Sequence, residues 1–401
     1  MIKNRDIVVV GLQPWDIEIG SNCKNIAAEF SKNNRVLYVN APLDRFTAIK
    51  QKNKASIIKR KKIIKGELPK IEELQNNLWN LYPQCLIESI SSLKNNYLFD
   101  LLNKRNNKIF AREIKKAIDE LGFKDIILFN DSDMLRSYYL KELLTPKTYV
   151  YYSRDNLVSM DYWKTQGKRI EALHMKKADI VVANSTYLAK LSSQYNPKSF
   201  YVGQGCDVSA FKSENVTKIP EDIKDIKKPI IGYIGALLTV RLDINIIIYI
   251  AKEKPEWNVV LVGPEDESFK NSELHKLDNV FFLGNKDGEE LPAYLDAFDV
   301  AINPQILNEL TIGNYPRKID EYLAMGKITI ATKTEAMSVF SEHTYLAENK
   351  EDYVKLIEKA LDENTKEKED ARILFSNEHT WENNVKEIYK RIFESEEQRK
   401  Y

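Results

Sequence analysis

Residues 315–330 (YPRKIDEYLAMGKITI) place a cation and a carboxylate on one predicted helix. Lys318 and Glu321 are close enough in sequence for a helix to present both on one face. Pro316 suits the first helical position, and Gly326 suits the position after the last turn. Unpaired N–H groups at a helix N-terminus can hold a phosphate, and a carboxylate one turn deeper can accept hydrogen bonds from a ribose diol. The stretch predicts a nucleotide-sugar site, although a solvent-facing Lys/Glu pair on an amphipathic helix has the same spacing.

Short apolar runs alternate with longer helical patterns along the whole chain. Several runs lack polar alternation, which is expected of strands covered by helices on both faces. The repetition predicts parallel sheets with right-handed crossovers, and the runs are too numerous for one sheet, so we expect two. Ligands of such sheets bind beyond the carboxyl ends of the strands. The predicted strands are 6–10, 35–40, 126–130, 149–153, 180–183 and 199–202, then 230–234, 258–262, 280–283, 300–303 and 328–332.

A polar stretch separates the two series of strands. We predict a linker at 212–229, between an N-terminal domain of residues 1–211 and a C-terminal domain of residues 230–380. Residues 381–396 carry an apolar stripe with helical spacing, and we expect this helix to pack back on the first domain.

Composition limits the class of protein. The chain has 401 residues, 43% of them hydrophobic, and a net charge of +1, which describes a soluble two-domain protein with no overall field for nucleic acid. Cys23, Cys85 and Cys206 lack CxxC spacing, and the histidines lack metal-ligand spacing, so we expect neither a disulfide framework nor a metal site. No apolar run reaches the roughly 18 residues of a membrane helix, and the first run is too short for a signal peptide. These features predict a cytoplasmic protein.

Several segments in the second half carry a family resemblance. They are 231–237 (IGYIGAL) with Asp243, 261–264 (LVGP), 279–284 (NVFFLG), 299–304 (DVAINP) and 316–326, preceded by 184–185 (NS) and 205–211 (GCDVSAF). In this order the chain resembles the nucleotide-sugar glycosyltransferases of the GT-B fold, in particular the retaining family 4 and its teichuronic acid and exopolysaccharide branch. The resemblance implies an α/β protein with two Rossmann-like domains facing across a cleft.

The resemblance also implies roles for residues of the second domain. Glu321 matches the second glutamate of the family's E-x7-E motif and would bind the donor ribose, whereas the first glutamate is replaced by Gly313. Asn308, Thr311 and the neighbouring Glu309 would supply the contacts that Gly313 cannot make. The other implied donor residues are Arg241 and Lys318 on the diphosphate, Gly235 where the backbone approaches the donor, and Gly284 with Asn285 near the base.

Polar residues that follow strands of the first domain are candidates for acceptor binding and catalysis. Gln13, Trp15 and Asp16 follow the first strand, and an exposed Trp-Asp pair would suit a sugar, although Trp15 could fold back into the core. Asp155 matches the position of a catalytic acid in the related enzymes, but it could instead cap a helix or pair with Arg154.

Weaker candidates lie close to these residues in sequence. Asp131 and Asp133 have the spacing of a metal-binding D-x-D motif, but they lie in the wrong domain for a donor metal. His174 is expected to be structural.

Lys50 and Lys65 bound a segment that is rich in lysine and arginine, contains no acid, and has isoleucine pairs interleaved. Such a segment could lie on anionic lipid, which would suit a lipid-linked acceptor, or could be a solvated charged helix. Nucleic acid is disfavoured by the near-neutral net charge.

Together these features predict a glycosyltransferase that moves a sugar from a UDP- or GDP-linked donor to a glycan or lipid-linked acceptor. It would need no cofactor and no metal, and would work in the cytoplasm or at the inner face of the membrane. A nucleotide-sugar 2-epimerase and a non-catalytic glycan- or lipid-binding protein on the same fold remain alternatives.

Overall fold

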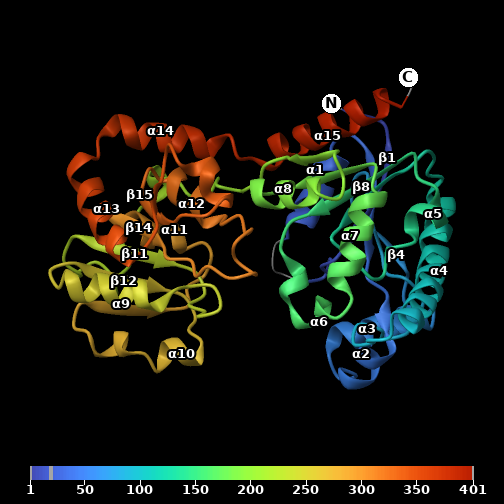
Figure 1. Ribbon diagram of the computed structural model, residues 1–401, viewed down its shortest axis with the longest axis horizontal. Helices are drawn as coiled ribbons and strands as arrows, with labels where there is room; N and C mark the ends of the chain where they lie inside the picture. Colours follow the sequence, from blue (N-terminus) through green and yellow to red (C-terminus); the bar gives the residue numbers. More distant parts are fainter. Residues whose placement is uncertain (1, 18–20, 400–401) are drawn as a thin grey trace. The chain divides into compact units, whose positions relative to one another are not determined.

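The computed structural model describes residues 2–17 and 21–399, and the chain divides into two compact units (Figure 1). Unit 1 comprises Met1–Gly203 and Trp381–Tyr401, and unit 2 comprises Gln204–Thr380. Each unit has a sheet of mainly parallel strands with apolar cores on both faces, so the predicted α/β class with two Rossmann-like domains is confirmed. The unit boundary lies earlier in the chain than the linker expected at 212–229, and Ile223 of that stretch is buried in the core of unit 2.

The sheet of unit 1 has the order β10-β9-β8-β7-β1-β2-β5-β4 and is parallel except for the β4–β5 pair. Its central strand β1 pairs with β2 and with β7, so that Val9 lies opposite Tyr38 on one side and Phe129 on the other. The strand order reverses between β1 and β7, where loops diverge and ligands bind in such folds. The strands are β1 (Asp6–Gly11), β2 (Arg35–Asn40), β4 (Ile71–Gln75), β5 (Leu78–Leu81), β7 (Ile127–Asp131), β8 (Thr148–Ser153), β9 (Ile180–Ala183) and β10 (Ser199–Tyr201).

Helices cover both faces of this sheet. Helix α1 (Asn22–Ser31) lies beside α15 (Trp381–Glu397) on one face, where Phe30 stacks on Tyr389 with ring centroids 5.3 Å apart (Figure 1). Helix α4 (Asn96–Leu121) buries Phe110 and Ile114 on the other face. The other elements of unit 1 are α2 (Arg45–Lys50), α3 (Ala55–Ile64), α5 (Leu140–Leu144), α6 (Asp161–Lys164), α7 (Gly167–Lys177), α8 (Thr186–Ser193) and the small sheet of β3 (Leu43–Asp44) with β6 (Leu86–Ile87).

The sheet of unit 2 is entirely parallel and has the order β13-β12-β11-β14-β15-β16. Helices α9 and α13 contribute to the core on one face, and α11 and α12 to the core on the other. The strands are β11 (Ile230–Ile234), β12 (Asn258–Val262), β13 (Val280–Gly284), β14 (Val300–Asn303), β15 (Ile328–Thr332) and β16 (Tyr345–Ala347). The helices are α9 (Ile244–Glu253), α10 (Glu267–Lys270), α11 (Leu291–Ala297), α12 (Lys318–Ala324), α13 (Lys350–Glu363) and α14 (Lys366–Asn377).

All of the predicted strands are present, with ends that differ by no more than a residue. The helix predicted at 316–325 is shorter than expected, because the helical hydrogen bonds of α12 begin at Lys318 and Pro316 lies in the preceding loop. Gly326 ends the helix with a φ of 68°, as predicted. Within the part of the chain that the structure describes, no helix is long and apolar enough to cross a membrane.

Candidate functional site

A cavity of about 350 Å³ lies at the carboxyl ends of β11 and β14 in unit 2. These two strands are neighbours in the sheet, and the strand order reverses between them. At such a point the loops after the two strands run to opposite sides of the sheet, and the crevice between them is where open α/β sheets bind ligands. The cavity is lined by Tyr233, Ile234, Gly235, Arg241, Leu242, Leu291, Asn303, Gln305, Thr311, Asn314, Tyr315, Pro316, Arg317, Lys318 and Glu321. It brings together five of the predicted donor residues, namely Gly235, Arg241, Thr311, Lys318 and Glu321.

Cations dominate the charge of this cavity. Arg241 is exposed, and its side chain makes no hydrogen bond or ion pair with any residue that the structure describes. The Nε atom of Arg317 is buried and also lacks a hydrogen-bond partner among the described residues. With Lys318 they supply three cationic side chains against the one carboxylate of Glu321. Guanidinium donors without protein partners are suited to phosphate oxygens.

Lys318 is positioned by Tyr233 and by the absence of a side chain at Gly235. The ammonium of Lys318 donates a hydrogen bond to the Tyr233 hydroxyl and lies 3.9 Å from the centre of its ring. A Cβ atom at Gly235 would lie 2.6 Å from the same ammonium, and Gly235 has a φ of 139° that L-residues rarely adopt. The loop after β11 therefore requires glycine where it passes Lys318.

Helix α12 carries Glu321 and is tied directly to the end of β11. The Tyr322 hydroxyl accepts a hydrogen bond from the backbone N–H of Ile234 at 3.0 Å, which fixes the helix relative to Gly235. Burial raises the pKa of the Glu321 carboxyl, while Arg317 and Lys318 act to lower it. Because α12 has only seven residues, its N-terminal dipole is small, and positive charge in the cavity comes mainly from side chains.

Asn308 and Thr311 shape the loop that follows β14. The Asn308 side chain accepts hydrogen bonds from the backbone N–H groups of Leu310 and Thr311 and donates one to the Val240 carbonyl at 2.9 Å. Asn308 thus joins this loop to the one that carries Arg241, and does not itself line the cavity. Gly313 is buried in the same loop.

Gly284 and Asn285 lie at the same edge of the sheet but outside the lining of this cavity. Gly284 ends β13 with a φ of 71°, and its carbonyl accepts a hydrogen bond from Gly263 at 2.8 Å. Both Gly284 and Asn285 are exposed. Their assignment to the donor base stays a prediction.

A buried polar network supports α12 from behind. Asp320 is wholly buried and lies next to Glu321 in sequence. Its carboxylate accepts a hydrogen bond from the Tyr315 hydroxyl at 3.0 Å and lies 2.6 Å from Nδ1 of His379. The Ser376 hydroxyl donates to the Asp320 carbonyl at 2.7 Å. Burial raises the pKa of the Asp320 carboxyl, and His379 opposes that effect.

Five residues in and behind the cavity were not predicted from the sequence, namely Tyr233, Tyr315, Arg317, Asp320 and Tyr322. Arg317 directly precedes the predicted Lys318, and Asp320 directly precedes the predicted Glu321, so the only signal in the sequence was a charged residue next to a predicted one. Tyr233 lies in a predicted strand and Tyr322 in the predicted helix, and neither gave a signal, because their partners are distant in sequence. Tyr315 precedes the predicted helix and its partner Asp320 is five residues away.

In unit 1, Asp155 follows β8 and forms part of a three-residue charge cluster. Arg154 lies between two carboxylates, with its Nε 2.6 Å from Asp131 and its Nη1 2.9 Å from Asp155. Asp131 is fully buried, whereas the Asp155 side chain is 34% exposed. The ion pair between Arg154 and Asp155 that the sequence left open is therefore present, and a catalytic role of Asp155 stays a prediction.

Asp131 and Asp133 do not behave as a metal-binding pair. Asp131 is neutralised by Arg154, and Asp133 lies 2.9 Å from the guanidinium of Arg136. Both carboxylates are wholly buried. Across the described ranges, no group of three or more potential ligands could hold a metal ion.

The loop of Gln13, Trp15 and Asp16 is held against unit 1. The half-buried Trp15 ring packs on the core edge-on to Tyr38, with centroids 4.9 Å apart, which is one of the two arrangements that the sequence left open. The Gln13 carbonyl accepts a hydrogen bond from the Tyr38 hydroxyl at 2.6 Å. Asp16 lies 3.6 Å from Arg60. Binding of an acceptor by this loop stays a prediction.

His174 is structural, as expected. Its Nδ1 lies 2.8 Å from the Tyr149 hydroxyl and its Nε2 2.7 Å from the Met134 carbonyl, and burial lowers its pKa to about 3. Glu171 is also buried, and burial raises its pKa to about 7.

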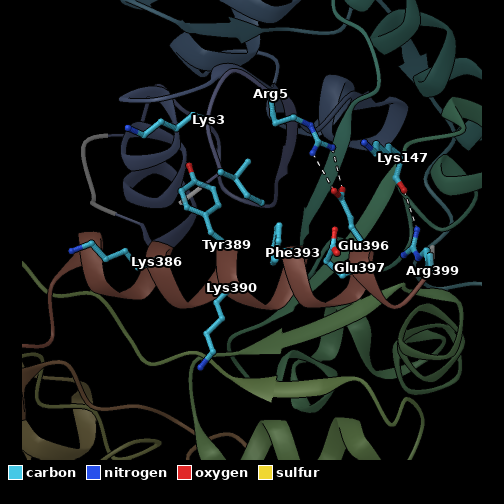
Figure 2. Close-up of a pocket in the computed structure, with 11 residues that line it drawn as sticks. Lys3, Arg5, Lys147, Lys386, Tyr389, Lys390, Phe393, Glu396, Glu397 and Arg399 are labelled. Atoms are coloured by element: carbon cyan, nitrogen blue, oxygen red, sulfur yellow. Dashed lines mark hydrogen bonds and ion pairs between the residues drawn. The ribbon is translucent and has the colours of Figure 1, made fainter. Parts of the chain in front are cut away.

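A more voluminous cavity, about 860 Å³, lies between the N-terminal residues and α15 in unit 1 (Figure 2). It borders the amino ends of strands, since Arg5 precedes β1 and Lys147 precedes β8. Arg5 forms two hydrogen bonds with Glu396, at 3.1 and 3.2 Å, across the cavity (Figure 2). It is at the wrong edge of the sheet for a ligand site of this fold.

The fold of the whole chain and the sequence of its second half both resemble those of known proteins. Over 98% of its length the chain superposes on all of a sucrose-phosphate synthase from Thermosynechococcus elongatus, with a TM-score of 0.65 at 14% identity. Over 97% it superposes on all of Anabaena HepE in complex with UDP, also with a TM-score of 0.65 at 14% identity. Residues 216–387 match the family model described as glycosyl transferases group 1. The chain has the GT-B fold and carries a group 1 glycosyl transferase domain.

The chain is also similar to a protein of Bacillus subtilis (strain 168). This relative is TuaH, whose name describes a glycosyltransferase of teichuronic acid biosynthesis, and it is 28% identical over 224 residues. The alignment spans 53% of the chain and 55% of TuaH, so about half of the relative's length is matched. The cavity at β11 and β14 lies within the matched group 1 domain.

Proposed function

We propose that the chain transfers a sugar from a nucleoside diphosphate-sugar to a glycan or lipid-linked acceptor in the synthesis of a surface or extracellular polysaccharide. One observation carries the proposal: the cavity at the carboxyl ends of β11 and β14 combines Arg241, Arg317 and Lys318 with Glu321. A nucleoside diphosphate-sugar needs cations for its phosphates and an acceptor of hydrogen bonds for its ribose. The similarity of the chain to TuaH supports a polysaccharide product.

The cationic side chains stabilise the charge that develops as the sugar leaves. Breaking the glycosidic bond of the donor places negative charge on the departing diphosphate. Arg241 and Arg317 can share that charge through guanidinium donors, and Lys318 adds an ammonium held by Tyr233. Three cations allow leaving-group stabilisation without a metal ion. The reaction then proceeds in the cytoplasm with retention of configuration, as in the enzymes that the sequence resembles.

The remaining predicted residues have roles in the same reaction. Glu321 accepts hydrogen bonds from the ribose hydroxyls, and Gly284 with Asn285 borders the base. In unit 1, Asp155 faces the acceptor or the positive charge on the sugar, held by Arg154. Gln13 and Asp16 border the acceptor, while the packed Trp15 fixes their loop.

The decisive experiment measures thermal stability of the purified chain with UDP, GDP, ADP, CMP and their sugar conjugates, with and without magnesium. A ligand that binds only the folded state raises the midpoint, by about 2.7 kcal/mol of stability at 100 times its Kd. We expect a shift with UDP or GDP that does not need magnesium and disappears in Glu321→Ala. Glu256→Ala, an exposed glutamate outside the cavity, is the control and should keep the shift. No shift with any nucleotide at millimolar concentration would overturn the proposal.

Gly313 favours a second function, a non-catalytic protein that keeps the fold and binds a glycan or lipid. It replaces a glutamate of the family motif and lies buried in the loop after β14. The two functions differ in turnover: the enzyme consumes a nucleotide-sugar when an acceptor is present, whereas the binding protein leaves it intact. Product analysis by NMR also separates transfer from 2-epimerisation. Among the described residues that line the cavity no histidine occurs, which disfavours the epimerase.

A further inference from the structure

Helices α2 and α3 form a small helical hairpin at the periphery of unit 1 (Figure 1). The hairpin has an apolar core of its own, in which Ala48 of α2 and Ile57 of α3 are buried together with Leu43. Other large apolar side chains point outward. Phe46 is 60% exposed and Ile49 is 74% exposed, both on α2, and Ile58 on α3 is 43% exposed.

The outward apolar residues are not needed to hold the hairpin together. Phe46 and Ile49 share one face of α2, and Ala48 packs on a different face. A single exposed hydrophobic residue is ordinary on a protein surface, whereas neighbouring ones indicate a contact.

Lysines without protein partners lie beside these apolar residues. Lys52, Lys54 and Lys62 are exposed, and their ammonium groups form no ion pair or hydrogen bond with a described residue. Lys52 and Lys54 lie in the turn between the helices, and Lys62 lies one turn after Ile58 on α3. No acidic residue occurs between Lys50 and Lys65.

Other basic residues of the segment are engaged within the protein. Arg60 is mostly buried and lies 3.6 Å from Asp16, and Lys59 lies 3.8 Å from the same carboxylate. Lys65 lies 3.7 Å from Glu67. The structure thus separates Lys59 and Arg60, which face Asp16 of unit 1, from the lysines that face solvent.

From this arrangement we infer that the outer hairpin surface, defined as Phe46, Ile49, Lys52, Lys54, Ile58 and Lys62, docks on an anionic lipid bilayer. A bilayer surface offers an apolar layer for the phenylalanine and isoleucines, and lipid phosphates for the lysines directly above it. A nucleic acid would engage the lysines and leave the apolar residues exposed. The inference does not depend on the proposed transfer reaction, because it rests on unit 1 alone.

Co-sedimentation of the full chain with vesicles tests the inference. Vesicles of phosphatidylcholine alone are compared with vesicles that contain phosphatidylglycerol. We expect binding to the anionic vesicles only, weakening as salt is raised. Each surface lysine contributes about fivefold to such partitioning, so K52E/K54E/K62E should lower the partition coefficient about 100-fold or more. F46S/I49S should lower it about tenfold or more while keeping every charge.

Matched variants in unit 2 serve as controls. K276E/K355E/K359E changes the net charge by the same amount at exposed lysines, and I219S/L374S removes two exposed apolar side chains. Both should bind anionic vesicles as the native chain does. Equal binding to neutral vesicles, equal loss in the control variants, or binding to a DNA duplex with none to vesicles would overturn the inference. Thermal midpoints of all variants confirm that each remains folded.

Discussion

Gly235 controls where the ammonium of Lys318 lies. A methyl group at this position would meet the ammonium at 2.6 Å and the Tyr233 hydroxyl at 3.0 Å. The lysine side chain is flexible, so it would swing away and take its charge out of the cavity. The backbone would also be strained, because φ at this glycine is 139°.

We predict that Gly235→Ala weakens binding of the diphosphate nucleotide by about tenfold, which corresponds to about 1.4 kcal/mol. Titration calorimetry with UDP and GDP measures the change. Gly288→Ala is the control, because a Cβ atom there meets nothing within 4 Å. Unchanged affinity in Gly235→Ala would show that Lys318 does not contact the diphosphate.

Glu171 makes the stability of unit 1 depend on pH. The carboxyl has an ordinary pKa of 4.5 and a pKa of about 7 in the folded protein, where it is buried beside the Tyr151 hydroxyl. Between pH 4.5 and 7 the Glu171 carboxyl keeps its proton in the folded state but has lost it in the unfolded state. The free energy of unfolding therefore falls as pH rises through this range.

Glu171→Gln removes this dependence because the amide stays neutral. We expect the variant to be more stable than the native chain at pH 8, by up to about 3 kcal/mol, and no more stable near pH 4.5. Urea unfolding followed by tryptophan fluorescence at the two pH values measures the difference. A gain of equal size at both would contradict the assignment to ionisation.

Lys318, Glu321 and Arg241 could be predicted from the sequence, whereas Tyr233 and Tyr322 could not. The predicted residues could be recognised by their charge, their spacing and their place in the family motif. Tyr233 and Tyr322 have the pattern of ordinary core residues, and only the packing of β11 against α12 reveals that their hydroxyls hold the site. For Trp15 the sequence left two arrangements open, because an aromatic residue in a loop can bind a sugar or pack on the core, as it does here.

At the scale of elements, α12 depends on the loop that follows α14. Asp320 is buried and is paired with His379, which stands just beyond the end of α14. Removing one partner of a buried pair leaves the polar group of the other buried without a hydrogen bond, which costs stability.

We expect His379→Ala to destabilise unit 2 by about 1–3 kcal/mol through this effect. Because α12 also carries Lys318 and Glu321, the affinity for the nucleotide should fall with stability, while the vesicle binding of unit 1 stays unchanged. Thermal unfolding and nucleotide titration of the same variant measure both quantities. Loss of stability with full affinity would show that the network supports the fold alone.

The predicted strands include every central strand of unit 2 and two edge strands, β10 and β13, whereas β3, β4, β5, β6 and β16 were not predicted. Central strands such as β1 and β11 are continuous apolar runs, because helices cover both of their faces. The edge strand β4 has the sequence IEELQ and is largely exposed, so it lacks that signal. The two-residue strands β3 and β6 are too short to show any period.

At the scale of the whole molecule, the chain passes from unit 2 back to unit 1, where it ends in helix α15. This helix buries Val385, Ile388, Tyr389 and Ile392 in the core that α1 also covers. Removing it would expose that core, at a cost of about 1.5–3 kcal/mol for each large side chain.

We therefore predict that a chain ending at residue 380 loses the thermal transition of unit 1 and keeps that of unit 2. The midpoint shift caused by nucleotide should survive, because the cavity at β11 and β14 lies wholly in unit 2. Scanning calorimetry with and without UDP or GDP separates the two transitions. Loss of the nucleotide shift together with α15 would show that the donor site needs unit 1.

Both passages of the chain between the units are bonded to one another. The backbone N–H of Cys206, just after the first passage, donates to the His379 carbonyl, just before the second, at 2.8 Å. Unit 2 therefore starts and finishes at one place, as an insert does within a host. This makes residues 204–380 a transplantable cassette. Exchanging it for the corresponding segment of a relative would cut the chain at two neighbouring points and leave the core of unit 1 unchanged.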